Sequence, residues 1–515
     1  MLAGWRLMIL KMFEVRVLDL EFESQTIVMN ESDAEELHVG LGSRVKVTVD
    51  GREAIANTSF SSFLVARGEI GVCRSLVKLL GVSGGEQATL EVMTPPLALE
   101  YVRKKMKGEE LSYNEIFAII QSIAKEELSS AEITAFVLAQ YFKGMSDREI
   151  EALTISMAES GEKLRFKEKT YDKHSVGGVP GNKVSLLIVP IIAASGLLIP
   201  KTSSKAITSP SGTADTMEVL APVTFTIDEF REIVERVGGA IVWGGGLNIA
   251  PVDDIIIRVE HPLMIDPLPQ MIASILAKKL AVGVNNMVLD IPIGRGCKAQ
   301  SKEDAEKLAA KFLKIGGKLG INIQCGITYG GQPVGYTVGP TLEAKEALEA
   351  LMGRGPMSLV EKATALAGIL LEMGERAEIG QGHVVAKDIL RNGKALLKMR
   401  EIIEAQGGDP HVKPDDLPVG EHVATIKAEN DGYVVDVDNE AVKLIARAAG
   451  APTDKGAGII LRFKRGYKVS KGDVLMEIHS ENERRLSKAV ELALSLIPVR
   501  VEGMLLGRVL RDNAL

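Results

Sequence analysis

The sequence predicts a multidomain α/β protein with a small N-terminal β barrel, a helical bundle domain, a central α/β domain and a C-terminal, barrel-like α+β domain. Its 515 residues exceed what one hydrophobic core organises, so several domains are expected. Short runs of alternating apolar and polar residues in the first part indicate strands. Beyond Lys169, glycine-rich loops alternate with apolar strands and helical stretches, which indicates an α/β domain. We place the domains at residues 1–95, 96–168, 169–420 and 421–515.

The composition narrows the classes of function. The formal net charge is -7, and lysine and arginine are scattered rather than gathered in basic runs, so nucleic acid is not an expected partner. Cys73, Cys297 and Cys325 are far apart and outside any C-x-x-C spacing, which argues against disulfides and zinc. The seven histidines are also isolated from one another, so we expect no metal and no cofactor. This pattern predicts a reducing, cytoplasmic location.

Two apolar segments lack the features of an export or membrane signal. The N-terminus, MLAGWRLMILKMFEV, is interrupted by Arg6 and Lys11 and lacks a small-residue cleavage site. Met12 is therefore an alternative start to Met1. The most apolar window, residues 184–200, contains serine, proline and glycine and falls short of a membrane span. We interpret it as buried core and expect no membrane partner.

The predicted barrel begins at Phe13 and ends near Thr94. Runs such as VRVLDLEF and VKVTV are separated by glycine and aspartate turns. HVGLGSRVKVTV, from His38, and LGVSGGEQATLEV, from Leu80, share a short helix end, a glycine turn and an alternating strand. This internal repeat predicts two pseudo-symmetric halves.

The segment after Pro96 has apolar residues at helical spacing. Ser-x-x-Glu pairs that begin at Ser112 and Ser129 mark helix starts of the capping-box type. Another helical stretch, within residues 251–282, interrupts the later α/β rhythm, and we expect it to pack back onto the bundle.

The C-terminal part, from about Glu421, carries short strands with a later helix. GYKVSKGDVLMEIHS resembles one half of a lipoyl- or biotin-carrier barrel. A carrier needs an acceptor lysine on a tight hairpin, such as Met-Lys-Met, and the sequence has none there. Packing or assembly is therefore the favoured role.

A polar, glycine-rich loop, DKHSVGGVPGNKVSLLIVP from Asp172, leads into an apolar helix that is expected to begin near Lys183. Glycines let a backbone approach an anion, and a helix N-terminus offers unpaired N–H groups. Further donors are the side chains of Lys173, His174, Ser175 and Ser185. A plain strand-to-helix turn would explain the glycines alone, but the Lys-His-Ser triplet favours an oxyanion site.

A hydroxyl-rich segment, PKTSSKAITSPSGTADTMEVL from Pro200, follows one βα unit later. Neutral donors with one lysine suit phosphate or sugar hydroxyls, which need directional hydrogen bonds. A solvated serine-rich loop is the alternative. Ligands collect at the carboxyl ends of strands in α/β sheets, which favours a binding site here.

These two segments carry a resemblance to a known family. KHSVGGVPG and TSSKAITSPSGTADTMEVL resemble the two phosphate-loop signatures of the thymidine phosphorylase family, and the resemblance continues through DPLPQMIASILAKKLAVGVNNMVLDIPIGRG to the end of the chain. Within that family, the N-terminal extension and the GGVPGNK and SSKAITS variants are similar to the archaeal AMP phosphorylases. The resemblance implies a pentosyltransferase that converts AMP, and also CMP and UMP, with inorganic phosphate into free base and ribose 1,5-bisphosphate.

The resemblance also implies roles for individual residues. Asp266 matches the proposed general acid, and His174 is the other catalytic candidate. Positions that match the inorganic phosphate contacts are Lys173, His174, Ser175, Ser185, Ser203 and Thr213. Positions that match nucleotide contacts are Gly178, Ser204, Lys205, Ala206, Ile207, Thr208, Ser209, Thr213, Ser274 and Lys298. A carboxyl group in a closing, partly dry cleft can protonate a leaving base, because burial raises the pKa of a carboxyl.

Ser274 and Lys278 stand four residues apart on a predicted helix and therefore share a face. The matching pair contacts the pyrimidine in the nucleoside enzymes, while an ordinary surface lysine is the alternative for Lys278. The family's base-contacting arginine is displaced, since Arg258 stands one place from the position that Val259 occupies. This departure counts against a simple pyrimidine-nucleoside specificity. The nearby pair of aspartates, Asp253 and Asp254, is interpreted as an exposed turn or helix cap.

Three other functions stay open on the sequence. A pyrimidine-nucleoside phosphorylase differs only in whether a 5′-phosphate fits. A transferase that joins a base or amine to phosphoribosyl pyrophosphate uses a similar fold, but it should need magnesium and an acidic metal motif that the sequence does not show. A non-catalytic assembly protein would have a degenerate middle, whereas the polar loops are most complete there. Family members dimerise through the helical domain, so we expect a homodimer or a larger homo-oligomer.

Overall fold

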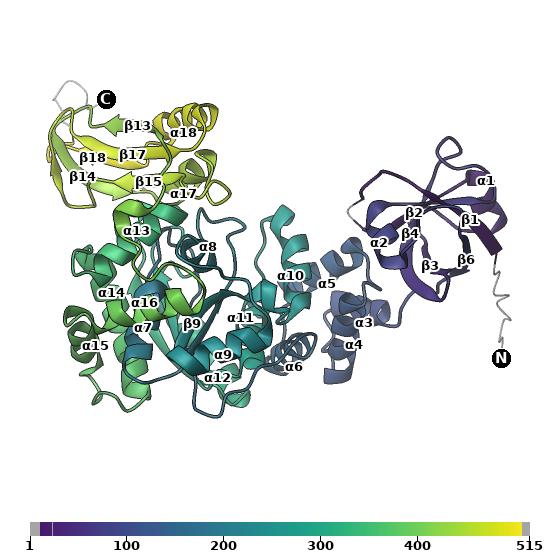
Figure 1. Ribbon diagram of the computed structural model, residues 1–515, viewed down its shortest axis with the longest axis horizontal. Coiled ribbons are helices and arrows are strands. Elements are labelled where there is room, and N and C mark those ends of the chain that lie inside the picture. The colour runs from purple at the N-terminus through teal and green to yellow at the C-terminus, as the bar shows by residue number, and fades with distance from the viewer. Residues whose placement is uncertain (1–10, 23, 507–515) are drawn as a thin grey trace, which may run out of the picture. The chain divides into compact units, whose positions relative to one another are not determined.

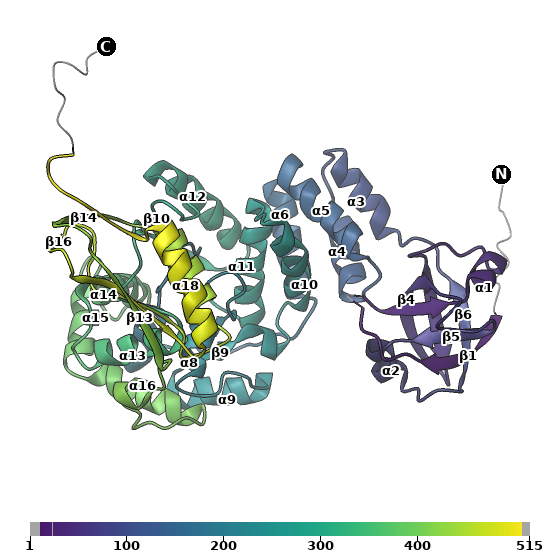
Figure 2. The ribbon, with the colours of Figure 1, turned by 90° about the horizontal axis from the view of Figure 1, so that it is seen from above.

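The computed structural model describes residues 11–22 and 24–506 (Figures 1 and 2). The choice between the two starts of the chain concerns residues 1–10, which lie outside this part. The chain divides into two compact units. One holds the described residues up to Ala152 together with Ile255–Leu268, and the other holds Leu153–Asp254 and everything described from Pro269 onward. The predicted domain boundaries are finer than this division and stay predictions.

The N-terminal strands close into a barrel in the order β1-β5-β2-β4-β3-β6. The strands are β1 (Lys11–Val17), β2 (Thr26–Met29), β3 (Arg44–Val49), β4 (Arg52–Phe60), β5 (Glu69–Val72) and β6 (Gln87–Val92), and the short helices are α1 (Glu31–Glu36) and α2 (Arg74–Leu80). Alternation along the strands buries one side chain in two, such as Phe13 and Val47, inside the barrel. The two repeated stretches supply β3 and β6, which pair directly with each other.

The helical segment forms α3 (Ala98–Met106), α4 (Tyr113–Ala124), α5 (Ser130–Lys143) and α6 (Asp147–Ala158). The capping boxes predicted at Ser112 and Ser129 are both present, with the serine hydroxyl and the glutamate three residues later exchanging hydrogen bonds with each other's backbone N–H. Within residues 251–282, the stretch Ile255–Leu268 belongs to the same compact unit as α3 to α5. It contains most of α10 (Pro251–Glu260) and the short helix η2 (His261–Leu263).

A buried ion pair ties α3 to α6. Lys105 Nζ lies 2.6 Å from Glu149 Oε1, and the same oxygen accepts a 3.0 Å hydrogen bond from the backbone N–H of Leu111. Both side chains are almost fully buried. Such a pair depends on both partners, because either charge alone would be left in a dry interior.

Replacing Glu149 with alanine should lower the free energy of unfolding by about 3 kcal/mol, because the charge of Lys105 loses its buried partner. Urea unfolding of the full chain measures this change. In the matched control, Glu53→Ala, the partner is Lys46 on the barrel surface, and the loss should stay below about 0.5 kcal/mol. An equal decrease in the free energy of unfolding in the two variants would contradict the expectation that the buried pair contributes more to stability than the surface pair.

The central strands are parallel and share one carboxyl edge. β7 (Tyr171–Ser175) pairs with β10 (Asn286–Ile293), which pairs with β11 (Asn322–Tyr329). β8 (Ile199–Ser203) pairs with β9 (Gly239–Trp243), and a parallel bridge between Thr170 and Leu198 joins the two groups. The loops that follow β7, β8 and β10 therefore leave the same edge, where ligands bind in α/β folds.

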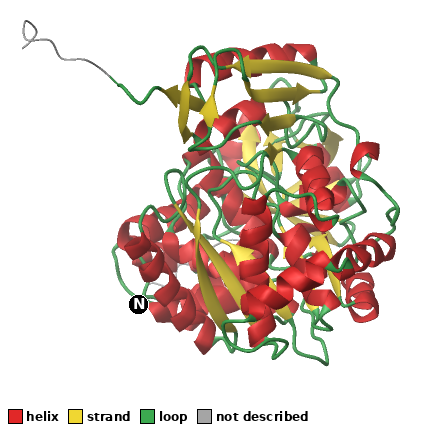
Figure 3. Ribbon diagram, turned by 90° about the vertical axis from the view of Figure 1, so that its left-hand side faces the viewer, coloured by secondary structure: helices red, strands yellow, loops and turns green. Residues whose placement is uncertain are grey.

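Helices enclose these strands (Figure 3). They are α7 (Ser185–Ala194), α8 (Thr213–Glu218), α9 (Ile227–Val237), η1 (Gly244–Leu247), α11 (Leu268–Val282), α12 (Lys302–Lys318), α13 (Pro340–Leu351), α14 (Met357–Met373), α15 (Gly382–Arg391), α16 (Lys394–Ala405) and η3 (Pro414–Asp416). The apolar window at residues 184–200 forms α7 and the start of β8, and α7 is buried on all sides, as predicted. Among the described residues, no helix is long and apolar enough to cross a membrane.

The C-terminal strands make two sheets, so the predicted barrel-like form is wrong for the described residues. The elements are β13 (His422–Lys427), β14 (Gly432–Val437), α17 (Asn439–Ala448), β15 (Gly458–Leu461), β16 (Lys468–Val469), β17 (Val474–Ser480), α18 (Glu483–Leu496) and β18 (Val499–Glu502). The first sheet has the order β12-β15-β17-β13, in which β12 is Thr337–Val338, and the second has the order β16-β14-β18. Apolar residues of α17 and α18 pack with strand residues in one core, which provides the burial that closure of a barrel would otherwise supply. Because β12 lies before residue 420, the first sheet includes one strand that the sequence analysis assigns to the central domain.

Candidate active site

Loops after β7 and β10 meet at the carboxyl edge of the central strands. Gly178 has φ +95°, and a Cβ atom there would stand 2.7 Å from Cys297 Cα and 3.3 Å from Lys298 N. Only glycine fits both the left-handed backbone and this close approach. The structure thus brings Gly178 beside Lys298, whose side chain is exposed.

Asp290, in the middle of β10, organises the first loop. Its carboxylate accepts hydrogen bonds from Thr328 Oγ1 (2.6 Å) and Asn182 Nδ2 (3.2 Å), and Asn182 also donates to Ser175 Oγ. Lys362 Nζ, from α14, lies 3.1 Å from Asp290 Oδ2, and Lys173 Nζ lies 3.9 Å from the same atom. One buried carboxylate therefore holds two cations and fixes the position of Ser175.

Asp172 holds a second pair of lysines. Lys279 Nζ, from α11, lies 2.5 Å from Asp172 Oδ2, and Lys201 Nζ, from β8, lies 3.5 Å from Asp172 Oδ1. All three side chains are buried. A strand, its neighbour and a helix thus contribute charges beneath the predicted phosphate loop.

The site holds more positive than negative charge. Burial lowers the pKa of Lys173 to about 8, and burial also lowers the pKa of Lys201 to about 7, with neighbouring lysines adding to the effect. Burial, followed by Lys279, Lys201 and the other lysines nearby, holds the pKa of His174 well below its usual value, so its imidazole is neutral near pH 7. His174 Nδ1 has no hydrogen-bond partner among the described residues. This arrangement favours the binding of an anion.

The helix after the first loop starts slightly later than predicted. α7 begins at Ser185, which is buried, rather than at Lys183. The side chain of Lys183 is buried. Its ammonium pairs with Glu346 and donates a 2.8 Å hydrogen bond to the Thr337 carbonyl. It therefore anchors the loop to the segment around β12.

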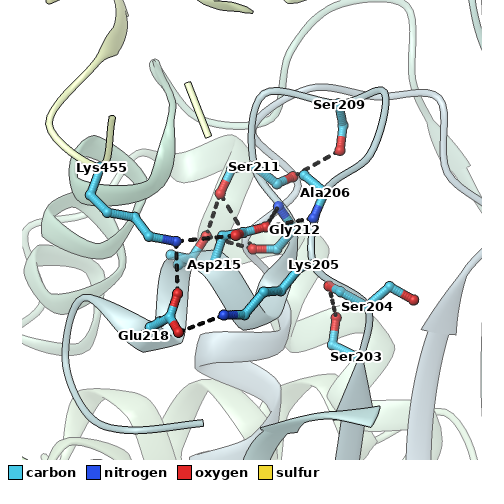
Figure 4. A network of polar contacts seen from close by, with 11 residues as sticks. Ser203, Ser204, Lys205, Ala206, Ser209, Ser211, Gly212, Asp215, Glu218 and Lys455 are labelled. Carbon is cyan, nitrogen blue, oxygen red and sulfur yellow. Dashed lines mark hydrogen bonds and ion pairs between the residues drawn. The ribbon is translucent and has the colours of Figure 1, made fainter. Parts of the chain in front are cut away.

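The hydroxyl-rich loop spans residues 204–212, between β8 and α8. Ser203 is the last residue of β8, and Thr213 is the first residue of α8. Asp215 Oδ2 accepts hydrogen bonds from the N–H groups of Ala206 (2.6 Å) and Gly212 (3.0 Å), which draws the two ends of the loop together (Figure 4). Residues on the outside of the loop that are exposed to solvent are Ser204, Ile207 and Thr208.

Two members of this loop are committed to internal contacts. Lys205 Nζ lies 2.6 Å from Glu218 Oε1 and 5.0 Å from the centre of the Trp243 ring. Ser209 Oγ donates a hydrogen bond to the Ser211 carbonyl. The predicted binding positions in this segment are therefore held in place by a network rather than presented on a loose loop.

Ser274 and Lys278 meet at one carboxylate. Ser274 Oγ donates 2.7 Å to Asp253 Oδ2, and Lys278 Nζ lies 2.6 Å from the same oxygen. Lys278 is mostly buried, so it is not an ordinary surface lysine. Burial alone would lower the pKa of Lys278, but Asp253 and Asp254 outweigh burial and raise this pKa above its usual value.

The interpretation of Asp253 as an exposed turn or cap residue is wrong. α10 begins at Pro251 and turns the Asp253 side chain to Ser274 and Lys278 of α11, where it is fully buried, while the Asp254 side chain is half-exposed. The sequence alone does not show which of the two adjacent aspartates is buried, because that depends on which side of α10 faces Ser274 and Lys278.

Asp266 and Arg258 belong to the other compact unit. Asp266 is exposed and lies between η2 and α11, and Arg258 lies near the end of α10. The phosphate-loop residues all belong to the second unit. The roles assigned to Asp266 and to the binding residues therefore stay predictions.

Sequence reasoning missed several buried charges of this site, namely Asp172, Lys201, Asp253, Lys279, Asp290 and Lys362. One of them carried a signal, because Asp290 interrupts the otherwise apolar strand β10, where a charge is rarely buried without a partner. Lys362 gave none, since a lysine on an amphipathic helix is usually solvated. Within the described residues, no group of three or more histidine, cysteine or carboxylate side chains is arranged to hold a metal ion.

Comparisons with known proteins match this architecture. Residues 99–161 match the helical bundle domain of a glycosyl transferase family, residues 167–396 match its a/b domain, and residues 433–500 match the pyrimidine nucleoside phosphorylase C-terminal domain. An AMP phosphorylase of Pyrococcus furiosus is 50% identical over 495 residues, which are 96% of this chain and 98% of that protein. The chain belongs to the AMP phosphorylase family. The resemblance stated from the two loop motifs is thereby confirmed.

Other AMP phosphorylases are similar to the same extent. The AMP phosphorylase of Thermococcus kodakarensis is 50% identical over 96% of this chain and 99% of its own length, and that of Methanocaldococcus jannaschii is 49% identical over 97% and 99%. Anthranilate phosphoribosyltransferase from Thermus thermophilus aligns with a TM-score of 0.50 at 20% identity, over 59% of this chain and 99% of that chain. The last likeness shows a shared fold.

If the loop after β7 binds inorganic phosphate as the sequence predicts, we expect its affinity for phosphate to fall above about pH 8, because Lys173 loses its charge there instead of near its usual 10.5. The dissociation constant should rise toward tenfold per pH unit, measured by calorimetry between pH 7 and 10. In Lys173→Gln the affinity should be lower and this pH dependence weaker. Constant affinity up to pH 10 in the unmodified protein would contradict the expectation.

Proposed function

We propose that this chain catalyses the phosphorolysis of AMP, and also of CMP and UMP, to free base and ribose 1,5-bisphosphate. The observation that carries the proposal is about 50% identity to AMP phosphorylases over nearly the whole length of both chains. In this proposal the protein is a pentosyltransferase that works in the cytoplasm as a homodimer or larger homo-oligomer. It needs no cofactor, and phosphate is its co-substrate.

The charge of the site supports phosphate as the attacking group. Lys173, Ser175 and the glycines that follow them lie at the carboxyl edge above a surplus of buried lysines. A phosphate bound there gains charge-assisted hydrogen bonds without displacing a carboxylate, because Asp172 and Asp290 are already paired with lysines. The neutral imidazole of His174 donates a hydrogen bond from one ring nitrogen and adds no further charge, so the phosphate stays nucleophilic.

In the proposed reaction, a phosphate oxygen forms a bond to the anomeric carbon of the ribose while the bond from that carbon to the base breaks. Positive charge develops on the ribose ring and is balanced by the phosphate. Asp266 gives a proton to the leaving base, for adenine at N7, and the electron pair of the broken bond stays with the base. The proton that hydrogen phosphate loses when it is esterified passes through solvent and restores the acid form of Asp266. The atoms of one nucleotide and one phosphate thus become one free base and one ribose 1,5-bisphosphate.

The nucleotide would lie between the two loops and the base-binding helix. Gly178 and Lys298, which the structure brings together, are proposed to receive the 5′-phosphate. The hydroxyl-rich loop supplies donors for the ribose and both phosphates. Ser274 and Lys278, oriented by Asp253, are proposed to contact the base.

Replacing Asp266 with asparagine should lower kcat for AMP by about a hundredfold, because the amide cannot donate the proton that assists departure of the base. Free adenine release measures kcat, and circular dichroism checks the fold. Asp228→Asn, on the exposed face of α9, is the matched control and should leave kcat unchanged. Full activity in Asp266→Asn would remove this residue from its role.

A substrate panel separates the two phosphorylase hypotheses. With excess phosphate and equal concentrations of AMP, CMP, UMP and thymidine, we expect release of base from the monophosphates. The reason is the exposed Lys298 beside Gly178, which suits a second phosphate group. Turnover of thymidine with none of any monophosphate would instead establish a pyrimidine-nucleoside phosphorylase.

A further inference from the structure

The hydroxyl-rich loop at residues 204–212 depends on one buried carboxylate. Asp215 Oδ2 accepts from Ala206 N and Gly212 N, and a Cβ atom at Gly212 would stand 2.7 Å from the Ser204 carbonyl oxygen. The two ends of the loop therefore cross at Asp215. A buried carboxylate that accepts two N–H bonds still needs a counter-charge for its second oxygen.

That counter-charge comes from the C-terminal domain. Lys455 Nζ lies 3.1 Å from Asp215 Oδ1 and 2.8 Å from Glu218 Oε2 (Figure 4). Glu218 in turn pairs with Lys205 of the loop. Burial alone would lower the pKa of Lys455, but Glu218 and Asp215 outweigh it and raise that pKa, so the ammonium stays charged across the physiological range.

A second cation of the same domain reaches the outer side of the loop. Arg447, on α17, places Nη1 2.5 Å from the Ile207 carbonyl oxygen and 3.5 Å from the Ser209 carbonyl oxygen. The stretch that contacts Arg447 lies between the two ends held by Asp215. Lys455 and Arg447 thus act on different parts of one loop.

Backbone contacts fix Lys455 relative to the central domain. The Lys455 carbonyl accepts a 3.1 Å hydrogen bond from Thr341 N at the start of α13. A Cβ atom at Gly339 would stand 2.3 Å from the Ala457 carbonyl oxygen, so the two segments pack backbone against backbone. Because these backbone contacts hold Lys455 in place, its side chain can fix the positions of Asp215 and Glu218 in addition to balancing their charge.

We propose that Lys455 and Arg447 are positioning residues that hold the hydroxyl-rich loop in its substrate-binding conformation, so that the C-terminal domain completes the nucleotide site. The inference rests on the proposed function, since it assigns the loop to AMP and phosphate. It also revises the sequence-based preference for packing or assembly as the role of this domain. Arg447 contacts the loop backbone directly, whereas Lys455 acts on the loop through Asp215 and Glu218 of α8.

The test compares Lys455→Met, Lys455→Arg and Arg447→Met with Lys345→Met by steady-state phosphorolysis of AMP. Lys345 is the matched control, because it pairs with Asp415 at 2.9 Å and its side chain is 32% exposed, against 3.1 Å and 35% for Lys455. We expect KM for AMP to rise about tenfold in Lys455→Met, with a smaller change in kcat. Lys455→Arg should recover most of the loss, and Lys345→Met should match the unmodified protein.

Amide hydrogen exchange supplies a readout that does not depend on turnover. Exchange at Ala206 and Gly212 should become faster in Lys455→Met, while exchange in α7 should stay unchanged. Unchanged KM and unchanged loop exchange in both Lys455→Met and Arg447→Met would overturn the inference. If Lys455→Met fails to fold, Arg447→Met decides alone, because its side chain is at the surface.

The two hypotheses fail in different ways. An unmodified protein that releases no base from any nucleoside monophosphate refutes the proposed function. An active unmodified protein, with both KM and loop exchange unaltered in the two variants, refutes only the role of the C-terminal cations.

Discussion

The surplus of buried positive charge at the carboxyl edge of the central strands is the constraint on which the rest of the site depends. Lysines are expensive to bury, and here their cost is offset by only a few aspartates, each of which is shared between two cations. Parallel strands make this possible, because Lys173, Lys201 and Asp290 stand on strands from separate parts of the chain that run side by side. An anionic substrate would supply the missing charge, so binding and local stability are coupled.

Much of this organisation follows from the sequence. The capping boxes, the apolar helix α7, the alternating strands of the barrel and the two polar loops are local features, and the type and order of residues along the chain predict each of them. The family was predicted from the same two loops, because their glycines and hydroxyls form long motifs. Local patterns are informative where the chain itself carries the constraint.

The rest depends on contacts between distant segments. The sequence places Asp253 at the surface, but its partners, Ser274 and Lys278, lie more than twenty residues later in the chain, on α11. Lys362 and Lys455 look like solvated lysines in sequence and become parts of the site only through packing of α14 and of the C-terminal domain. The C-terminal sheets likewise could not be distinguished from a barrel, since strand pairing between distant segments has no local signature.

The ladder between β12 and β15 has a consequence for how the C-terminal domain can move. Thr337 and Val338 pair with Ile460 and Ile459, so a strand of the central domain is also an edge strand of the C-terminal sheet. Rotation of that domain as a free module about residue 420 would break backbone hydrogen bonds. Any hinge that preserves them must carry β12 along, and Lys183 ties β12 directly to the start of α7. The C-terminal domain therefore cannot be separated from the central one without breaking a shared sheet, and loss or gain of this domain during evolution would also have to change the segment that anchors the loop after β7.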